Sequence, residues 1–394
     1  MSGPRYGNKL LFTCMLLVGR HLSFQKANAL VFPFFTSATN GSGGVSRRGW
    51  VKQAVGGVVV AAAVGNKIAI RGPEPFQPLP GSLDGKVIVI TGGNTGLGYE
   101  SAKRLAKGGA TVVITSRSLS KGQRAADLIK QESQNDKVFV VQLDLCDLDN
   151  VKSFPSRFQS TLGTNTQVDV LMNNAGVMAI PDRQLTKDGF ERQFQTNHLG
   201  HFALTGVMLP MFKEKNSRVI NVSSSAHQIA GKGLDFENLN GEKTYAPWSA
   251  YGASKLENIF FTKELQKKVE ESNKINLTNF KAMALHPGAV RTDLARYMMG
   301  EQDFVSMMDA KDVKPTFSLK ELLLLPLVYF TKSVERGATT QIWLAAGEGE
   351  KELNGGEYLQ NNKVVTLAKF AEDMDAATRL WEVSEEMSGV EYNL

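Results

Sequence analysis

The sequence predicts an α/β fold, namely a single doubly wound parallel sheet of about seven strands with helices on both faces. Two observations predict it. Short apolar runs rich in β-branched residues alternate with stretches long enough to form helices, which is the order of elements in a parallel sheet. In addition, the run at 86–90 continues directly into a glycine-rich turn at 91–98, and a helix is expected at 99–107.

The other elements are expected in the same alternation. The first strand, 86–90, is apolar along nearly its whole length, as in strands that are covered on both faces. Further strands are expected at 111–115, 138–142, 168–172, 218–222 and 280–285, with an edge strand at 355–359. Helices are expected at 121–134, from Tyr251 onward and at 367–388.

The glycine-rich turn predicts a binding site for the pyrophosphate of a dinucleotide. Residues without side chains let backbone N–H groups approach the phosphates, and the N-terminus of the following helix adds a favourable dipole. The glycines follow the spacing Gly-x-x-x-Gly-x-Gly over Gly92, Gly96 and Gly98, and not the commoner Gly-x-Gly-x-x-Gly. Many tight turns use glycine, so the prediction depends on the position of this one between a strand and a helix.

The net charge of +6 at pH 7 belongs to the N-terminal part of the chain. Residues 1–72 contain nine Lys and Arg and no acid, so the remainder has 36 basic and 39 acidic residues. Residues 73–394, here called the body, therefore carry a net charge of −3 and are not expected to bind nucleic acid. The two cysteines, Cys14 and Cys146, leave the body with one thiol, which excludes a disulfide framework and a thiolate metal cluster.

We expect a targeting leader at 1–72, a linker at 73–83 and one catalytic domain at 84–394. Leu10–Val18 matches the apolar core of a signal peptide, and Arg47-Arg48 precede a second apolar run. The leader resembles a two-part plastid presequence, which predicts a plastid location and a further route to the thylakoid. The alternatives are the endoplasmic reticulum or the mitochondrion, with an uncleaved anchor on a membrane surface.

Ser116-Arg117 follows the second strand, where a dinucleotide-binding fold carries an acid that binds the ribose 2′-hydroxyl of NAD. No acid stands at this place, and Arg117 would instead meet a 2′-phosphate. The sequence therefore predicts NADP(H) as the cofactor. A solvated surface arginine is the alternative.

Tyr251 and Lys255 are four residues apart, so on a helix their side chains face the same way. A nearby cation lowers the pKa of a phenol from about 10, which makes the tyrosine a usable general acid or base. The pair comes 27 residues after Ser224, which ends a predicted strand. Tyr245 has Ser249 at the same spacing and lacks the lysine.

These motifs together resemble the short-chain dehydrogenase/reductase family over about residues 84–389. Asn173-Asn174-Ala175-Gly176 is similar to a motif of that family, and Asp188–Phe202 resembles its retinol dehydrogenase and WW-domain oxidoreductase branch. The resemblance implies a Rossmann-type sheet. It also implies the catalytic residues Asn197, Ser224, Tyr251 and Lys255. The choice of Ser224 over its neighbours Ser223 and Ser225 depends on the motif.

The resemblance implies that the cofactor lies along several loops. Asp144 would face the adenine, although a helix cap is an alternative role for this side chain. The implied cofactor-binding residues are Gly92, Asn94, Thr95, Gly96, Leu97, Gly98, Arg117, Asp144, Leu145, Asn174, Ala175, Gly176, Tyr251, Lys255, Pro287, Gly288, Val290 and Thr292. Asn197 would hold a water of the proton relay.

The function implied is that of an NADP(H)-dependent oxidoreductase that interconverts a carbonyl and an alcohol on a small apolar substrate. Retinoids, carotenoids, tetrapyrroles and lipid aldehydes are the candidates. One alternative is an NADP(H)-binding redox sensor on a plastid membrane complex, although a sensor does not need Tyr251. A nucleotide-sugar epimerase would need the spacing Gly-x-x-Gly-x-x-Gly, which is absent.

Two further features have competing interpretations. His198 and His201 stand at a spacing that suits a metal, but no other ligands accompany them, so we expect structural histidines and no metal. The insert at 294–330 is rich in Met and aliphatic residues and suggests a lid over an apolar substrate or a contact with a membrane surface. His227 is expected to contact substrate or to cap a helix. The sequence makes no prediction of an oligomeric state.

Overall fold

A computed structural model describes residues 72–272, 277–290, 332–348 and 352–394. These residues belong to one compact unit of the chain, Ile70–Leu394. Apart from Gly72, the predicted leader lies outside the described residues, as do Thr292 and the insert at 294–330. Within the described part, no helix has both the length and the apolar content needed to cross a membrane.

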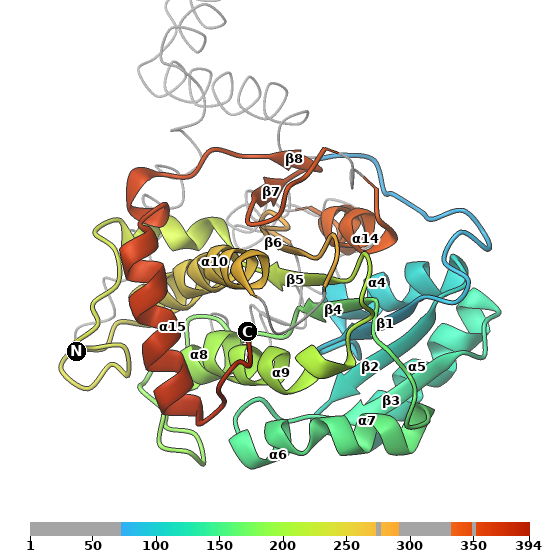
Figure 1. The fold of residues 1–394 in the computed structure, drawn as a ribbon, viewed down its shortest axis with the longest axis horizontal. Helices are drawn as coiled ribbons and strands as arrows, with labels where there is room; N and C mark the ends of the chain where they lie inside the picture. The colour runs from blue at the N-terminus through green and yellow to red at the C-terminus, as the bar shows by residue number, and fades with distance from the viewer. Residues whose placement is uncertain (1–71, 273–276, 291–331, 349–351) are drawn as a thin grey trace, which may run out of the picture. The chain divides into compact units, whose positions relative to one another are not determined.

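One sheet of eight strands forms the centre of the body (Figure 1), in the order β3-β2-β1-β4-β5-β6-β7-β8. All neighbours pair in parallel except β7 and β8, which form an antiparallel edge. The predicted parallel sheet is confirmed, with β8 added at the edge. The strands are β1 Val87–Ile90, β2 Thr111–Ser116, β3 Val138–Gln142, β4 Val170–Asn173, β5 Arg218–Val222, β6 Lys281–Leu285, β7 Tyr358–Gln360 and β8 Lys363–Val364.

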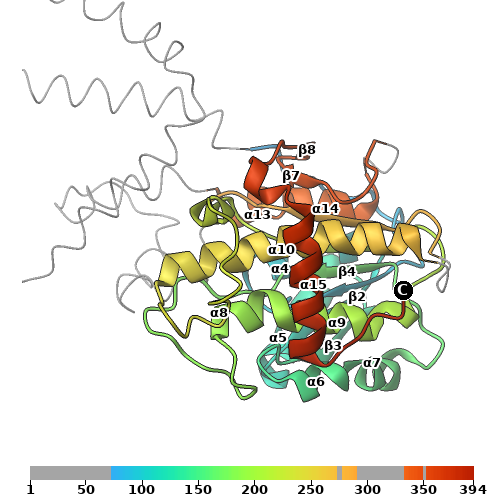
Figure 2. The same cartoon turned by 60° about the vertical axis from the view of Figure 1, so that its left-hand side comes forward.

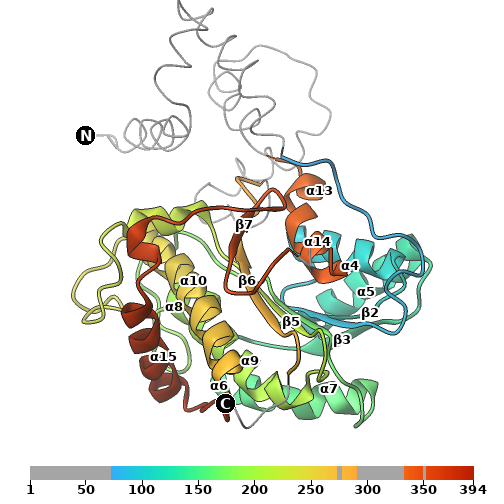
Figure 3. The same ribbon diagram turned by 45° about the horizontal axis from the view of Figure 1, so that its top comes forward.

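Helices cover both faces of the sheet. Figure 3 shows α4, α5 and α14 on one face and α9 and α10 on the other. The order of β1 beside both β2 and β4 means that the chain reverses its direction of winding there, which is the place where doubly wound sheets bind ligands. The helices are α4 Gly96–Lys107, α5 Leu119–Ser133, α6 Leu148–Lys152, α7 Phe154–Leu162, α8 Arg192–Phe194, α9 Gly200–Met208, α10 Pro247–Glu271, α13 Val334–Gly337, α14 Thr339–Ala346 and α15 Met374–Ser388.

Helix α15 packs across α10 and α9 (Figure 2) and closes the hydrophobic core on that face of the sheet. Trp381 of α15 is 2% exposed, and its ring centroid lies 5.0 Å from that of Phe202 and 4.4 Å from that of Tyr392. The Tyr392 hydroxyl donates to the Phe202 carbonyl at 2.6 Å. The last residues of the described chain are therefore part of the core.

The structure places several elements differently from the sequence prediction. The closing helix expected at 367–388 begins at Met374, where the Asp373 side chain caps it, and the edge strand expected at 355–359 lies at Tyr358–Gln360. Helix α10 begins at Pro247, one turn before Tyr251. Proline is favoured in the first turn of a helix, because N–H groups there have no hydrogen-bond acceptor within the helix and its missing N–H costs nothing. The segment Gln195–Leu199 is a π-helical turn between α8 and α9. Such turns are rare in proteins as a whole, and those that occur are often found at functional sites.

Candidate active site

The glycine turn between β1 and α4 has the shape that a pyrophosphate needs. Gly92 and Gly96 have φ angles of +64° and +55°, which other residues rarely adopt. A Cβ on Gly98 would lie 2.4 Å from the Gly92 carbonyl oxygen. A side chain at this position would fill the turn. Because glycine has none, the backbone N–H groups at the start of α4 stay open to an anion. These residues fit a dinucleotide.

The loop after β4 is fastened to the end of β1. The Thr91 hydroxyl accepts hydrogen bonds from the N–H groups of Asn174 and Ala175, both at 2.9 Å. The Asn174 side chain donates to the Thr91 carbonyl at 2.9 Å and accepts from Gln341 at 3.2 Å. Asn174 therefore shapes the predicted cofactor-binding loop through these contacts.

Asn197 lies in the π-helical turn and joins that loop to α10. Its amide donates to the Val177 carbonyl at 3.0 Å and to the Ser254 hydroxyl at 2.9 Å, and its oxygen accepts from the Val177 N–H at 2.8 Å. Both amide protons are used, so the side chain acts as a fixed tie. The role in holding a water stays a prediction.

Ser224, Tyr251 and Lys255 come together at the end of β5. The Ser224 side chain lies close enough to the Tyr251 phenol to lower its pKa, and the Lys255 Nζ lies 5.7 Å from the centroid of the Tyr251 ring. Nζ also donates to the Val222 carbonyl at 3.0 Å. The Lys255 Nζ and the Asn197 oxygen both lie close to Gly176, at 3.6 and 3.1 Å from the position of an added Cβ.

The structure distinguishes Ser224 from its neighbours. The Ser223 hydroxyl is buried and donates to the Lys255 carbonyl at 2.6 Å, so it faces the backbone of α10. Ser225 is exposed. Ser224 caps the 3₁₀ helix Ser225–Ala230, where its hydroxyl accepts from the Ala226 N–H. Ser224 is thus the serine of the three that contacts Tyr251.

Burial has the largest effect on the pKa values of Tyr251 and Lys255. It raises the pKa of Tyr251 to about 12, against the opposing effect of Ser224, and lowers the pKa of Lys255 to about 8. The expected lowering of the phenol pKa by the lysine is not seen, because both side chains are 4% exposed and desolvation disfavours both charges. At neutral pH Tyr251 is therefore protonated, which is the form that donates a proton.

The predicted adenine and ribose contacts lie after β2 and β3. Arg117 is exposed, and among the described residues no acid forms an ion pair with it. The Asp144 carboxylate accepts from the Cys146 N–H at 3.0 Å, so it stabilises its own turn. Leu145 beside it is 5% exposed. Arg117 is the charged side chain left available to a ligand at this edge.

Lys332, which the sequence analysis did not single out, holds the predicted nicotinamide turn. Its Nζ donates to the Pro287 carbonyl at 3.0 Å and to the Asn361 side chain at 2.7 Å. Its backbone pairs with Val290, and Gly288 in the turn has a φ of +90°. Burial and the charge of Arg336 lower the pKa of Lys332 to about 8. No local pattern reveals this contact, because the lysine lies 45 residues beyond Pro287.

His198 and His201 are both buried and take part in separate contacts. His198 Nε2 lies 2.9 Å from the Ser384 hydroxyl, and His201 bridges the Thr91 hydroxyl at 2.9 Å and the Asn197 carbonyl at 3.0 Å. Burial lowers their pKa values to about 3 and about 4. In the described part of the chain, no group of three potential ligands is placed to hold a metal.

The depressed pKa of His198 predicts a loss of stability in mild acid. Below its ordinary pKa of 6.5 the unfolded chain takes up a proton that the folded chain refuses, so the free energy of unfolding falls as pH falls. We expect His198 to contribute on the order of 2 kcal/mol of this loss between pH 7 and pH 5. Urea unfolding at the two pH values should show a smaller difference for His198→Phe than for the wild type. An equal difference in both proteins would contradict the assignment.

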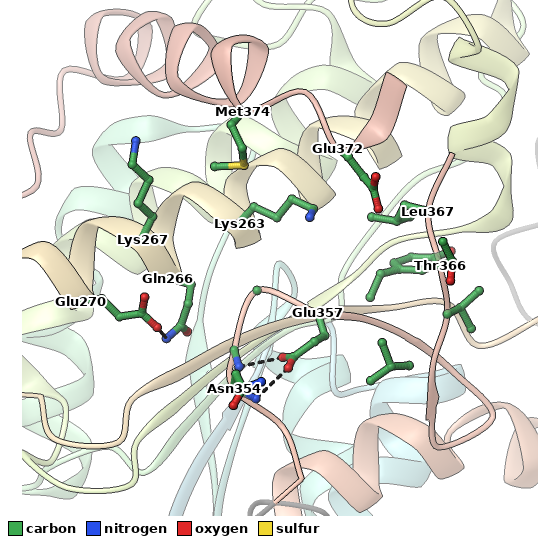
Figure 4. A pocket seen from close by; sticks show the side chains of 15 residues that line it. Lys263, Gln266, Lys267, Glu270, Asn354, Glu357, Thr366, Leu367, Glu372 and Met374 are labelled. Atoms are coloured by element: carbon green, nitrogen blue, oxygen red, sulfur yellow. Dashed lines mark hydrogen bonds between the residues drawn. The ribbon is translucent and has the colours of Figure 1, made fainter. Parts of the chain in front are cut away.

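A surface pocket of about 580 Å³ lies between α10, the segment at 354–358 and the start of α15 (Figure 4). Lys263 and Gln266 of α10 line one side, and Glu357 accepts hydrogen bonds from the backbone of Asn354 and Gly355, both at 2.7 Å. Asn197, Ser224, Tyr251 and Lys255 do not line it, whereas Tyr358 of β7 does. The four predicted catalytic residues lie instead around the carboxyl ends of β4 and β5 and the adjoining part of α10.

Comparisons with known proteins identify the class. Residues 86–303 match the short chain dehydrogenase family. Retinol dehydrogenase 12 of Mus musculus is 39% identical over 311 residues, which cover 79% of this chain and 88% of the relative. Retinol dehydrogenase 13 of Homo sapiens is 36% identical over 337 residues, covering 85% and 93%. A solved structure of an uncharacterized protein from Mycobacterium paratuberculosis is 32% identical with a TM-score of 0.60, covering 82% of this chain and all of that one.

The chain belongs to the short-chain dehydrogenase family, and it is an oxidoreductase similar to the retinol dehydrogenases. The resemblance given by the sequence motifs is thus confirmed.

The predicted plastid location is wrong. These relatives are retinol dehydrogenases of mouse and human, which are animals without plastids, and nothing in the comparisons supports a transit peptide or a thylakoid destination. The prediction relied on the composition of the leader, the apolar run Leu10–Val18 and the pair Arg47-Arg48, and such features suit more than one destination.

Proposed function

We propose that this protein is an NADP(H)-dependent oxidoreductase that interconverts the carbonyl and alcohol forms of a retinol-like, apolar substrate. The observation that carries the proposal is the convergence of Ser224, Tyr251 and Lys255 beside the loop that packs on the glycine turn. The names of the relatives support an apolar alcohol or aldehyde as substrate. No feature of the described residues supports the alternative of a redox sensor.

When bound, the nicotinamide supplies or accepts the hydride. In the direction of reduction, the neutral Tyr251 phenol donates its proton to the substrate oxygen as the carbonyl carbon gains the hydride. The Ser224 hydroxyl donates a hydrogen bond to the same oxygen while negative charge develops there. The Lys255 ammonium stabilises the phenolate that remains, since both groups are buried.

The preference for NADP(H) depends on Arg117. An exposed guanidinium without an acidic partner among the described residues is free to pair with a 2′-phosphate. We expect NADPH to bind at least about tenfold more tightly than NADH, because a charge-assisted contact contributes ~1.5–3 kcal/mol. In Arg117→Asp the preference should reverse, as measured by quenching of protein fluorescence. Equal affinity of the wild type for both cofactors would refute the assignment.

The substrate is tested with the full-length chain and NADPH. We expect oxidation of NADPH, followed by its absorbance, with retinal as carbonyl substrate, and a slower or absent reaction with small polar aldehydes. Fatty aldehydes, carotenoid aldehydes and tetrapyrrole carbonyls complete the panel. If every member of the panel fails while NADPH binds, the proposed substrate class is wrong.

A further inference from the structure

Tyr358 lies in β7 and takes part in a buried aromatic cluster next to the candidate active site. It pairs with Ala284 of β6 and is 4% exposed. Its ring is stacked on that of His286, with centroids 5.9 Å apart and planes at 16°, and meets His227 edge-on at 5.2 Å and 74°. Two histidines thus fix the direction in which the phenol points.

The hydrogen bonds of this cluster leave the Tyr358 hydroxyl proton without an acceptor. His227 Nδ1 lies 2.7 Å from the Ser224 carbonyl oxygen, and because a carbonyl only accepts, Nδ1 must carry the proton. The Tyr358 hydroxyl is 3.5 Å from the same nitrogen and therefore cannot donate to it. Within the described residues the hydroxyl has no other hydrogen-bond partner. A buried donor of this kind is rare in folded proteins and calls for an explanation.

The Tyr358 hydroxyl lies one side chain away from Ser224, because His227 Nδ1 is 3.5 Å from this hydroxyl and 2.7 Å from the Ser224 carbonyl oxygen. Through His227 it is joined to Ser224, whose side chain contacts Tyr251. Burial raises the pKa of Tyr358, and the charge of Tyr251 raises it further, so the two phenols lie within electrostatic reach. At neutral pH Tyr358 is therefore a neutral phenol that carries its proton.

We propose that Tyr358 is a further catalytic residue, whose hydroxyl donates a hydrogen bond to the reacting oxygen of the substrate beside Ser224 and Tyr251. The inference rests on the proposed function and adds to it a donor from a strand outside the motifs of the sequence. His227 and His286 would hold the phenol in place for this contact.

The test compares Tyr358→Phe with the wild type in the full-length chain, with retinal and NADPH as substrates. Phenylalanine keeps the ring contacts with both histidines and removes only the hydroxyl. We expect kcat/KM for retinal to fall about tenfold to a hundredfold, because a hydrogen bond to an oxygen that gains charge is stronger than an ordinary one. The affinity for NADPH, the midpoint of thermal unfolding and the pH profile of kcat/KM should not change. Tyr392→Phe is the matched control, because it removes a buried phenol hydroxyl that donates to the Phe202 backbone, and it should leave kcat/KM unchanged.

Three results would overturn the inference. One is a fall of less than about threefold in kcat/KM, which would be below the weakest ordinary hydrogen bond. A second is an equal loss in NADPH affinity or in thermal stability, which would show a structural role. A third is a displaced pH profile, which would mean that Tyr358 acts through Tyr251. If the wild type is active and Tyr251→Phe is inactive while Tyr358→Phe is unimpaired, only this inference fails, whereas a wild type without activity on any apolar carbonyl overturns the proposed function as well.

Discussion

Tyr251→Phe is expected to lower the rate of NADPH-dependent carbonyl reduction by about 10²–10⁴-fold, which is the usual contribution of general acid–base catalysis. The phenol is buried, protonated at neutral pH and close to Ser224, which is why we propose it as the proton donor. Phenylalanine keeps the packing of α10 and removes the proton. Steady-state kinetics should show the loss, while NADPH binding measured by fluorescence stays near the wild-type value.

Tyr245→Phe is the matched control, because Tyr245 is a phenol close in sequence whose hydroxyl donates to the Ile180 carbonyl at 2.8 Å. It has no lysine four residues further on. We expect this variant to keep most of its turnover. A Tyr251→Phe enzyme with most of its activity, together with an inactive Tyr245→Phe enzyme, would show that the wrong tyrosine has been assigned.

Trp381→Ala is expected to reduce the free energy of unfolding by about 3–5 kcal/mol, the range for removing a large buried aromatic side chain. The indole packs against Phe202, Phe261 and Tyr392 at the junction of α9, α10 and α15. Its loss would leave a cavity under the helix that carries Tyr251 and Lys255. Urea unfolding followed by circular dichroism measures the change.

The control for this variant is Leu128→Ala on α5, whose side chain is 51% exposed. We expect it to change the free energy of unfolding by less than about 0.5 kcal/mol, as is usual for surface positions. If Trp381→Ala lost no more than the control, α15 would not be an integral part of the core.

The central strands could be predicted from sequence because their apolar runs are buried on both faces. The prediction for β3 and β5 agrees with the observed bounds. The start of α10 lies four residues before the predicted start at Tyr251, because Pro247 is favoured in the first turn of a helix. The hairpin of β7 and β8 has a strand of two residues, which is too short for any periodicity.

The residues of the candidate site that lie close together in the sequence could be predicted from their spacing. The spacing of Tyr251 and Lys255 on one helix was sufficient to bring them together. Lys332 and Tyr358 reach the site only through the order of β6 and β7 in the sheet, and no local pattern encodes that order. The raised pKa of Tyr251 follows from burial, which depends on the packing of the whole domain.

The most direct test of the central claim is the transfer of deuterium from NADPH that is labelled at the reactive carbon of its nicotinamide. The full-length protein is incubated with the labelled cofactor and retinal, and the alcohol product is analysed by mass spectrometry. The account predicts retinol with one deuterium, formed at least about a hundredfold more slowly by Tyr251→Phe than by the wild type. Retinol without deuterium, or equal formation of the labelled product by both proteins, would contradict it.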